Sequence, residues 1–195
     1  MPGKIIIFSI VFFLSVKLCF SGSDNTGKKD DLKISFGYAQ TIVHFNNSSL
    51  VKLELELFIN KNLSVDYTLS GNFSQKNTFI HAPLGFVAGL ALLSETRETD
   101  FSSYDYLILL LMIIPEGVNY YIPMNDNINL VSYINPLGYD YFADDYSISS
   151  SLGAKLELLP LDNFSINPYA GLKLFYSHNS ASFGFETGLL VSIIF

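Results

Sequence analysis

An all-β fold is predicted for this chain: an antiparallel up-and-down barrel of eight transmembrane strands, with ten strands as the other count that fits. Three observations predict it. Apolar and polar residues alternate with the two-residue period of a strand along most of the sequence. Hydrophobic residues make up 49% of the chain and charged residues only 15%, which is apolar for a secreted protein. The chain ends on an apolar strand whose last residue, Phe195, is aromatic. Strands in lipid must close into a ring, because unpaired backbone groups find no water there.

The N-terminus has the organisation of a secretory signal peptide. Lys4 precedes an apolar run from Ile5 to Val16, and small residues follow at 21–23. The run has about a dozen residues, too few to span a bilayer as a helix, which takes about twenty. Lipidation of Cys19, the only cysteine, is the alternative, although the residues before it fit a lipidation signal poorly.

Three regions follow from this interpretation. Residues 1–22 are the predicted signal peptide, residues 23–31 a flexible periplasmic lead-in, and residues 32–195 a single barrel domain. The chain after the signal peptide contains no cysteine, so the small secreted folds that depend on disulfides are unsupported.

The first three strands are predicted over 32–41, 51–59 and 63–70. In each, residues at alternate positions form an apolar face and a polar face. The second strand shows this most clearly, because apolar residues such as Val51 and Leu53 alternate with lysine and glutamate. A helix would scatter the same residues around its circumference, so these segments are predicted to be strands.

The middle of the chain is less regular. Leu84 to Leu93 is interpreted as a strand bent at Gly85 and Gly89. Tyr106 to Ile114 is apolar on both faces, unlike a strand that lines a polar interior. It predicts an apolar interior patch, a strand packed under another element, or a cavity for a hydrophobic ligand, with packing favoured over ligand binding.

The remaining strands restore the alternating pattern. A short strand at 118–122 precedes a longer one at 128–142, which a proline and a glycine interrupt. The last three strands are predicted at 147–159, 164–176 and 183–195, with short hairpin connections between them. Most of these segments reach the 9–11 residues that a tilted transmembrane strand requires.

The last strand carries a pattern of its own. It has Glu186, then Gly188 two positions later, apolar residues at Val191 and Ile193, and Phe195 at the end. This pattern resembles the C-terminal signal of bacterial outer-membrane β-barrel proteins, and the alternation along the chain resembles the small barrels of the OmpA and OmpX type. The resemblance implies insertion by the outer-membrane assembly machinery with periplasmic chaperones, both termini in the periplasm, and longer loops outside.

Charged residues on the polar faces predict the content of the barrel interior. They are Lys33, Lys52, Glu54, Glu56, Asp66, Lys155, Glu157, Lys173 and Glu186. The interior of an eight-stranded barrel is only wide enough for side chains to fill. We therefore expect a network of buried ion pairs, and the alternative is a narrow polar path or a proton-linked site.

Catalysis and cofactor binding have little support in the sequence. The histidines are His44, His81 and His178, and pairing of His81 with Asp100 or Asp105 would need two loops to meet. The sequence contains no glycine-rich phosphate loop and no cysteine and histidine spacing typical of zinc. We therefore predict no enzymatic activity, no cofactor and no metal site.

The predicted function is that of a non-enzymatic integral protein of the bacterial outer membrane, with a structural role or with loops at Asn72–Ala82 and Ser94–Ser103 displayed for adhesion. One alternative is a barrel that binds a lipid or other apolar ligand near Leu107–Ile113, and a less favoured one is a lipid-modifying enzyme that uses His81 or His178. A soluble lipocalin-like barrel, with its apolar face turned inward, is the outside alternative. The predicted partners are outer-membrane lipid and the assembly machinery, with the extracellular partner unidentified. The formal charge of −7 argues against nucleic acid.

Overall fold

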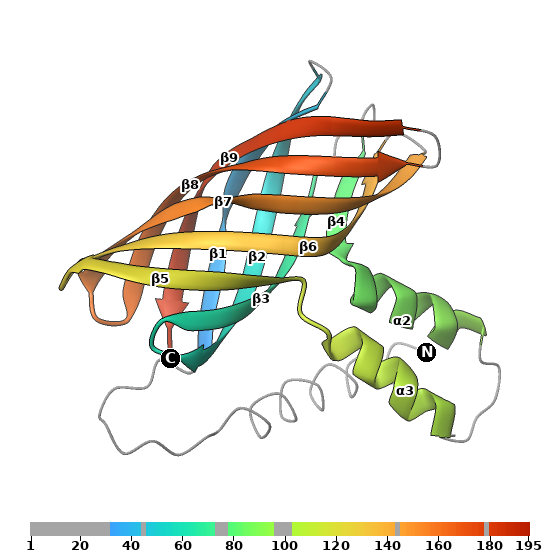
Figure 1. The fold of residues 1–195 in the computed structure, drawn as a ribbon, viewed down its shortest axis with the longest axis horizontal. Coiled ribbons are helices and arrows are strands. Elements are labelled where there is room, and N and C mark those ends of the chain that lie inside the picture. The colour runs from blue at the N-terminus through green and yellow to red at the C-terminus, as the bar shows by residue number, and fades with distance from the viewer. Residues whose placement is uncertain (1–31, 44–45, 73–77, 96–102, 143–144, 178–179) are drawn as a thin grey trace.

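The fold is described from a computed structural model, which covers residues 32–43, 46–72, 78–95, 103–142, 145–177 and 180–195. The predicted signal peptide at 1–22 and lead-in at 23–31 lie outside the described residues, as do His44, Asp100 and His178. Nine strands and two helices make up the described part of the chain (Figure 1).

The strands occur in chain order around two consecutive helices. They are β1 (Leu32–Val43), β2 (Asn46–Asn60), β3 (Leu63–Gly71), β4 (Phe79–Pro83), β5 (Gly117–Asn125), β6 (Ile128–Phe142), β7 (Asp145–Leu161), β8 (Phe164–Ser177) and β9 (Ser180–Ile194). The helices, α2 (Leu84–Glu95) and α3 (Ser103–Ile113), lie between β4 and β5. Neither helix reaches the length and apolarity that a membrane-crossing helix requires.

The strands form a closed antiparallel ring. Each strand from β6 to β9 pairs with the next, β9 pairs with β1, and β1 to β3 continue the ring. Both β4 and β5 pair with β3 on one side and with β6 on the other. They therefore share one position, and nine strands make a barrel of eight positions. The predicted all-β up-and-down barrel of eight is confirmed, with one position divided between two strands.

Side chains alternate between the two faces of this ring, as the sequence predicts. Along β1, Lys33 and Ser35 are buried inside, whereas Phe36 on the outer face is 60% exposed. Large apolar residues cover the outer face of every strand position, including Leu53, Leu152 and Leu189. The barrel therefore has an apolar exterior and a polar interior, the reverse of a soluble lipocalin-like barrel.

Both ends of the barrel domain meet at one end of the ring. The backbone N–H of Phe195 donates to the carbonyl of Leu32 at 2.9 Å. At the opposite end β1 stops at Val43 and β2 starts at Asn46, and the β6–β7 and β8–β9 connections are equally short. The longer loops that the resemblance implied are not found at these three connections.

Two predicted strands are helices in the structure. The segment Leu84–Leu93 belongs to α2, and Tyr106–Ile114 coincides largely with α3, so the strand interpretation of both is wrong. The physical reason is that both segments are apolar on all sides. A strand in this wall needs a polar face toward the interior, whereas a helix outside the ring does not.

Candidate functional site

The wall of the barrel is interrupted where the helical hairpin α2–α3 leaves it. Along β3, pairing with β5 ends at Asp66 and pairing with β4 resumes at Ser70. Along β6, the same change occurs between Ile134 and Gly138, beside a register shift. We call this region the wall break. It lies within the span of both neighbouring strands rather than at an end of the barrel.

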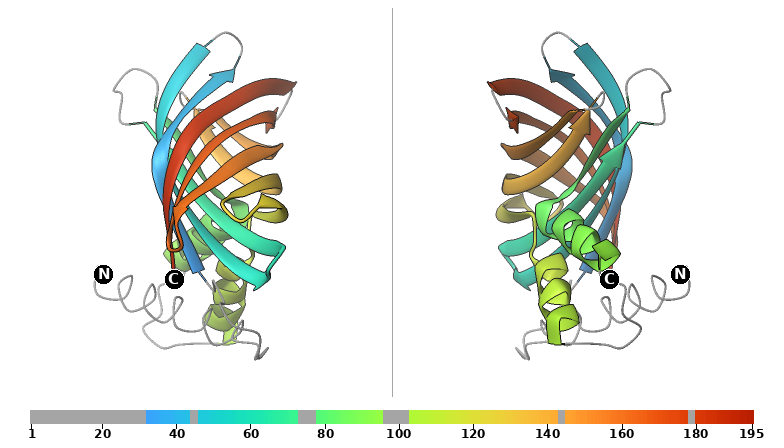
Figure 2. Two further views of the ribbon diagram at one scale, coloured as in Figure 1. Left: turned by 90° about the vertical axis from the view of Figure 1, so that its left-hand side faces the viewer. Right: turned by 90° about the vertical axis from the view of Figure 1, so that its right-hand side faces the viewer.

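The hairpin projects sideways from the ring (Figure 1). Figure 2 shows both helices outside the strands in two further views. The Tyr67 hydroxyl, on the outer face of β3, donates to the carbonyl of Ile113 at the end of α3. Ile113 also packs against a small apolar cluster that contains Leu57 and Val65. The hairpin is therefore tied to the wall at the break.

Two glycines allow the helices to approach each other closely. Gly85 and Gly89 are four positions apart on α2, and a Cβ at either would collide with α3, at the carbonyl of Leu111 and the side chain of Met112 respectively. This small-residue spacing in an apolar helix is typical of helix pairs packed in lipid. The same glycines that suggested a bent strand thus form a helix–helix contact.

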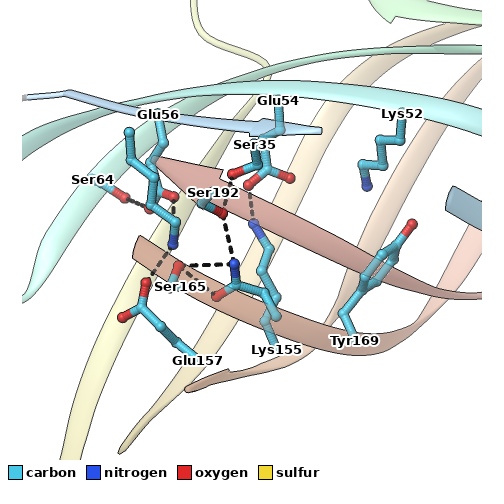
Figure 3. A network of polar contacts seen from close by, with 12 residues as sticks. Ser35, Lys52, Glu54, Glu56, Ser64, Lys155, Glu157, Ser165, Tyr169 and Ser192 are labelled. Atoms are coloured by element: carbon cyan, nitrogen blue, oxygen red, sulfur yellow. Dashed lines mark hydrogen bonds and ion pairs between the residues drawn. The ribbon is translucent and has the colours of Figure 1, made fainter. Parts of the chain in front are cut away.

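The interior contains the charged residues that the sequence singled out. Buried positions are found for Lys33, Lys52, Glu54, Glu56, Asp66, Lys155, Glu157, Lys173 and Glu186. Figure 3 shows part of this network, in which side chains from β2 face those from β7 across the interior. The predicted residues thus come from different strands and meet inside one polar interior.

Most of these charges are paired. Lys33 lies 2.7 Å from Glu157 and 3.4 Å from Glu56, and Lys155 contacts Glu54. Lys52 lies 3.2 Å from Glu186. Because a buried charge without a partner is costly, each pair depends on both members being present.

Aromatic side chains support the pairs in the interior. The ring of Tyr169 lies 4.5 Å from Lys52 Nζ, and its hydroxyl donates to Glu186 at 2.9 Å. The Tyr121 hydroxyl donates to Glu56 at 2.5 Å, and Lys33 Nζ donates to that hydroxyl at 3.0 Å. The predicted list did not include these tyrosines, although their alternation with outward residues places them on the inner face.

A second cluster lies at the wall break. It joins the two half-strands, β4 and β5, which share one position of the ring. His81 on β4 places Nε2 2.8 Å from Glu116 and Nδ1 3.0 Å from Asp140. Lys173 Nζ lies 2.7 Å from Asp140 and 3.0 Å from His81 Nδ1. These contacts pair His81 with two carboxylates and an amine, which is the arrangement of an ion cluster rather than of a base beside a nucleophile.

The sequence interpretation missed most of this cluster. It paired His81 with Asp100 or Asp105, but the contacts of His81 in the described residues are with Glu116, Asp140 and Lys173. The alternation along β6 would have placed Asp140 inside if the bulge near Pro136 had been recognised. No pattern in the sequence marks Glu116, because it follows the apolar segment that was interpreted as a strand.

Unpartnered polar atoms concentrate at the wall break. Eight buried side-chain nitrogen and oxygen atoms of the described residues have no hydrogen-bond partner, and six of them belong to residues around the break. Those residues are Asp66, Thr68, Glu116, Asn119 and Asn135. Part of the group borders a cavity inside the barrel, which Thr68, Asn135, His81 and Lys173 help to line. The regular wall contains no comparable group in the described residues.

The residues of the C-terminal pattern lie on β9, between β8 and β1, except Phe195, which directly follows the strand. Glu186 faces inward, whereas Val191, Ile193 and Phe195 are exposed on the outer face. Gly188 lies beside the ring of Tyr169, where a Cβ would collide with the ring. The inner members of the pattern therefore contribute to the interior, while the outer members are exposed on the outer face.

No protein-family model and no curated protein matches the sequence. Solved structures similar to this chain include neisserial surface protein A, with a TM-score of 0.47, 11% identity, and coverage of 84% of this chain and 96% of that one. The N-terminal β-barrel domain of Pseudomonas aeruginosa OprF has a TM-score of 0.46 and 8% identity, and the match covers 83% of this chain and 97% of that one. Ail, the attachment invasion locus protein of Yersinia pestis, has a TM-score of 0.46 and 14% identity, with coverage of 83% of this chain and 97% of that one. The assignment of the fold rests on the strand pairing described above.

Proposed function

We propose that this chain is an integral protein of the bacterial outer membrane with a structural, non-enzymatic role. The observation that carries the proposal is the opposite arrangement of its two faces: the exterior is apolar around the ring and the interior holds the charges. Such a barrel is stable where lipid covers the exterior, because closure of the ring leaves no open sheet edge.

A structural role is favoured over a pore because side chains fill the interior. The ion pairs of Lys33, Lys52 and Lys155 cross it from one wall to another. An eight-stranded barrel has no room for both these side chains and a passage for solutes. We expect no stepwise ion conductance in a planar bilayer, and recurrent single-channel steps would contradict a closed interior.

Display of loops for adhesion has weaker support. Part of the predicted loop Asn72–Ala82 is strand β4, whose residues His81 and Ala82 are buried. The predicted loop Ser94–Ser103 connects α2 to α3 rather than two strands of the barrel. Of the first segment, residues 72–78 connect β3 to β4 at the same end of the barrel as the β6–β7 connection, whereas the second segment is not a barrel loop. Display would thus depend on one connection, and the structural role is the proposal that we retain.

The first experiment is cell fractionation combined with gel mobility of boiled and unboiled protein. We expect the full chain to sediment with outer membranes and to migrate differently before boiling, because a closed barrel resists unfolding in detergent. Recovery as a soluble protein without a mobility shift would contradict the proposal.

Recognition by the assembly machinery is tested with one matched pair of variants. Phe183 and Phe195 both lie on the outer face near opposite ends of the last strand, 72% and 62% exposed. Phe195→Ala should lower the amount of folded barrel in cells but not its refolding in detergent micelles. Phe183→Ala should change neither, and an equal loss for both variants would contradict a specific terminal signal.

Binding of an apolar ligand is the second candidate, and the hairpin favours it. Leu107 and Leu110 on α3 are about 60% exposed. An acyl chain lying along α3 would bury such residues. Extraction of protein purified in a mild detergent should then yield a stoichiometric lipid that Leu107→Ser and Leu110→Ser together remove, while Leu152→Ser on the opposite wall retains it.

A further inference from the structure

We propose that the interior holds one divalent cation of the calcium type at the wall break, bound by oxygen atoms of Asp66, Glu116 and Asn135. Two observations lead to this site: the charge balance of the interior, and the convergence of unpartnered oxygens at Gly117.

The first observation is an excess of negative charge among the buried residues. Seven buried carboxylates are described: Glu54, Glu56, Asp66, Glu116, Asp140, Glu157 and Glu186. Against them stand four buried lysines, Lys33, Lys52, Lys155 and Lys173, and one histidine, His81. Two negative charges remain even when His81 is counted as positive. Uncompensated buried charge is very costly, so the interior requires two further positive charges.

The excess is located at the wall break. The other five carboxylates each have a lysine partner within the described ion pairs. Asp66 has no ion-pair partner there, and Glu116 uses only one oxygen, on His81, while its Oε2 has none. Asp66 is 1% exposed and Glu116 is 2% exposed, so bulk water does not compensate either charge.

The second observation is that unpartnered oxygens point to one place. Asp66 Oδ1 and Asn135 Oδ1 both lie within 2.6 Å of the point that a Cβ would occupy at Gly117. Glu116, whose Oε2 is unpartnered, is the preceding residue, and its backbone N–H donates to the Asp66 carbonyl at 2.9 Å. A carboxylate oxygen and an amide oxygen thus meet at the start of β5, next in sequence to a residue that carries a second buried carboxylate.

Gly117 is what allows these two oxygens to come together. Any side chain at position 117 would collide with Asp66 and Asn135. The residue is paired with Asp66 of β3, whose side chain is buried in the interior. A larger residue here would therefore displace the two converging oxygens.

The donor set identifies the class of ion. Carboxylate and amide oxygens without sulfur or imidazole favour hard cations such as Ca²⁺, which accepts six to eight oxygens in flexible geometry. No three His, Cys, Asp or Glu side chains of the described residues gather as a metal centre by themselves. The proposed site therefore relies on two carboxylates, with amide and hydroxyl oxygens such as Thr68 Oγ1 completing the shell.

The test measures calcium bound to the folded full chain in detergent, after treatment with EDTA and dialysis against about 1 mM Ca²⁺, the range of extracellular calcium sites. We expect one ion per chain by elemental analysis. Asp66→Asn should abolish binding, and Asp126→Asn, at an exposed carboxylate in the β5–β6 turn, should leave it unchanged.

A second variant keeps the test decisive if Asp66→Asn does not fold. Gly117→Ala would displace the oxygens of Asp66 and Asn135 and should also abolish binding in protein that retains its mobility shift before boiling. Absence of bound calcium in the folded wild-type chain would overturn the proposal and assign the missing positive charges to protons. Calcium that both Asp66→Asn and Gly117→Ala retain would overturn the location.

Discussion

The wall formed by β8, β9 and β1 and the wall formed by β3 to β6 differ in how they satisfy their buried polar groups. In the first, Asn167 donates to Ser192 at 2.7 Å and to Ser165 at 3.0 Å, and Ser192 donates to Ser35 at 2.8 Å. In the second, Asn119 is equally buried but its amide nitrogen and oxygen have no partner. An uninterrupted ladder positions inner side chains opposite one another, whereas the wall break leaves a group of them without protein partners.

The largest effect is expected from breaking a paired charge. Lys155→Met leaves Glu54 without its partner in the interior, and loss of one member of a buried pair costs about 3–5 kcal/mol. Asp66→Asn removes a charge without a protein partner and should not destabilise the barrel in EDTA. Urea unfolding in lipid vesicles, followed by the fraction of unboiled folded protein on gels, measures both. Equal destabilisation would remove the distinction between the two walls.

Substitutions of the two buried asparagines, Asn167 and Asn119, should change the stability of the barrel by smaller amounts and in opposite directions. Asn167→Leu leaves Ser192 and Ser165 without this donor, which costs about 1–3 kcal/mol for an unsatisfied buried group. Asn119→Leu replaces an amide without hydrogen bonds and should stabilise the barrel. The same urea titration compares them in EDTA, and destabilisation by Asn119→Leu would show that Asn119 has a partner.

A change in the hairpin should affect the hairpin and leave the ring intact. Gly89→Leu introduces a side chain where Met112 packs, and overpacking of this kind costs about 1–3 kcal/mol. Ala91→Leu adds a side chain at an exposed position of the same helix and serves as the control. We expect faster proteolysis between α2 and α3 only for Gly89→Leu. Loss of the mobility shift before boiling would show instead that the ring depends on the hairpin.

The smallest effect on the ring is expected from removing the hairpin altogether. Continuing the registers along β3 brings Pro83 opposite Thr68 and Gly117 opposite Asp66, which leaves Tyr67 as the one position between the half-strands. Replacement of Leu84–Glu116 by a single serine should therefore yield a continuous strand. We expect the shortened protein to retain its mobility shift, and a protein that no longer folds would show that the hairpin stabilises the wall break.

Sequence alternation was sufficient to predict the regular wall. In β2, β8 and β9 successive residues alternate between the exterior and the interior, so the period of two specifies both the strand and the side on which a charge such as Lys173 lies. The nine charged residues assigned to the interior on this basis are buried there.

The same reasoning failed where the period is absent. Tyr106–Ile114 lacks a polar face, and a short apolar run of this kind does not distinguish a strand from a helix by periodicity. The spacing of Gly85 and Gly89 was the available signal for a helix pair. The cluster of His81, Glu116 and Asp140 was not predictable, because it forms only when two half-strands separated by the hairpin come into line.

The divided strand position also has a consequence for engineering. The strands β4 and β5 run in the same direction and occupy one position of the ring. The chain therefore leaves the wall and returns to it while the barrel keeps an even number of strand positions. Foreign segments are usually grafted into loops at barrel ends, which present them to water. Pro83 and Gly117 instead offer a graft site in the side of the barrel, from which an inserted segment would extend within the plane of a bilayer.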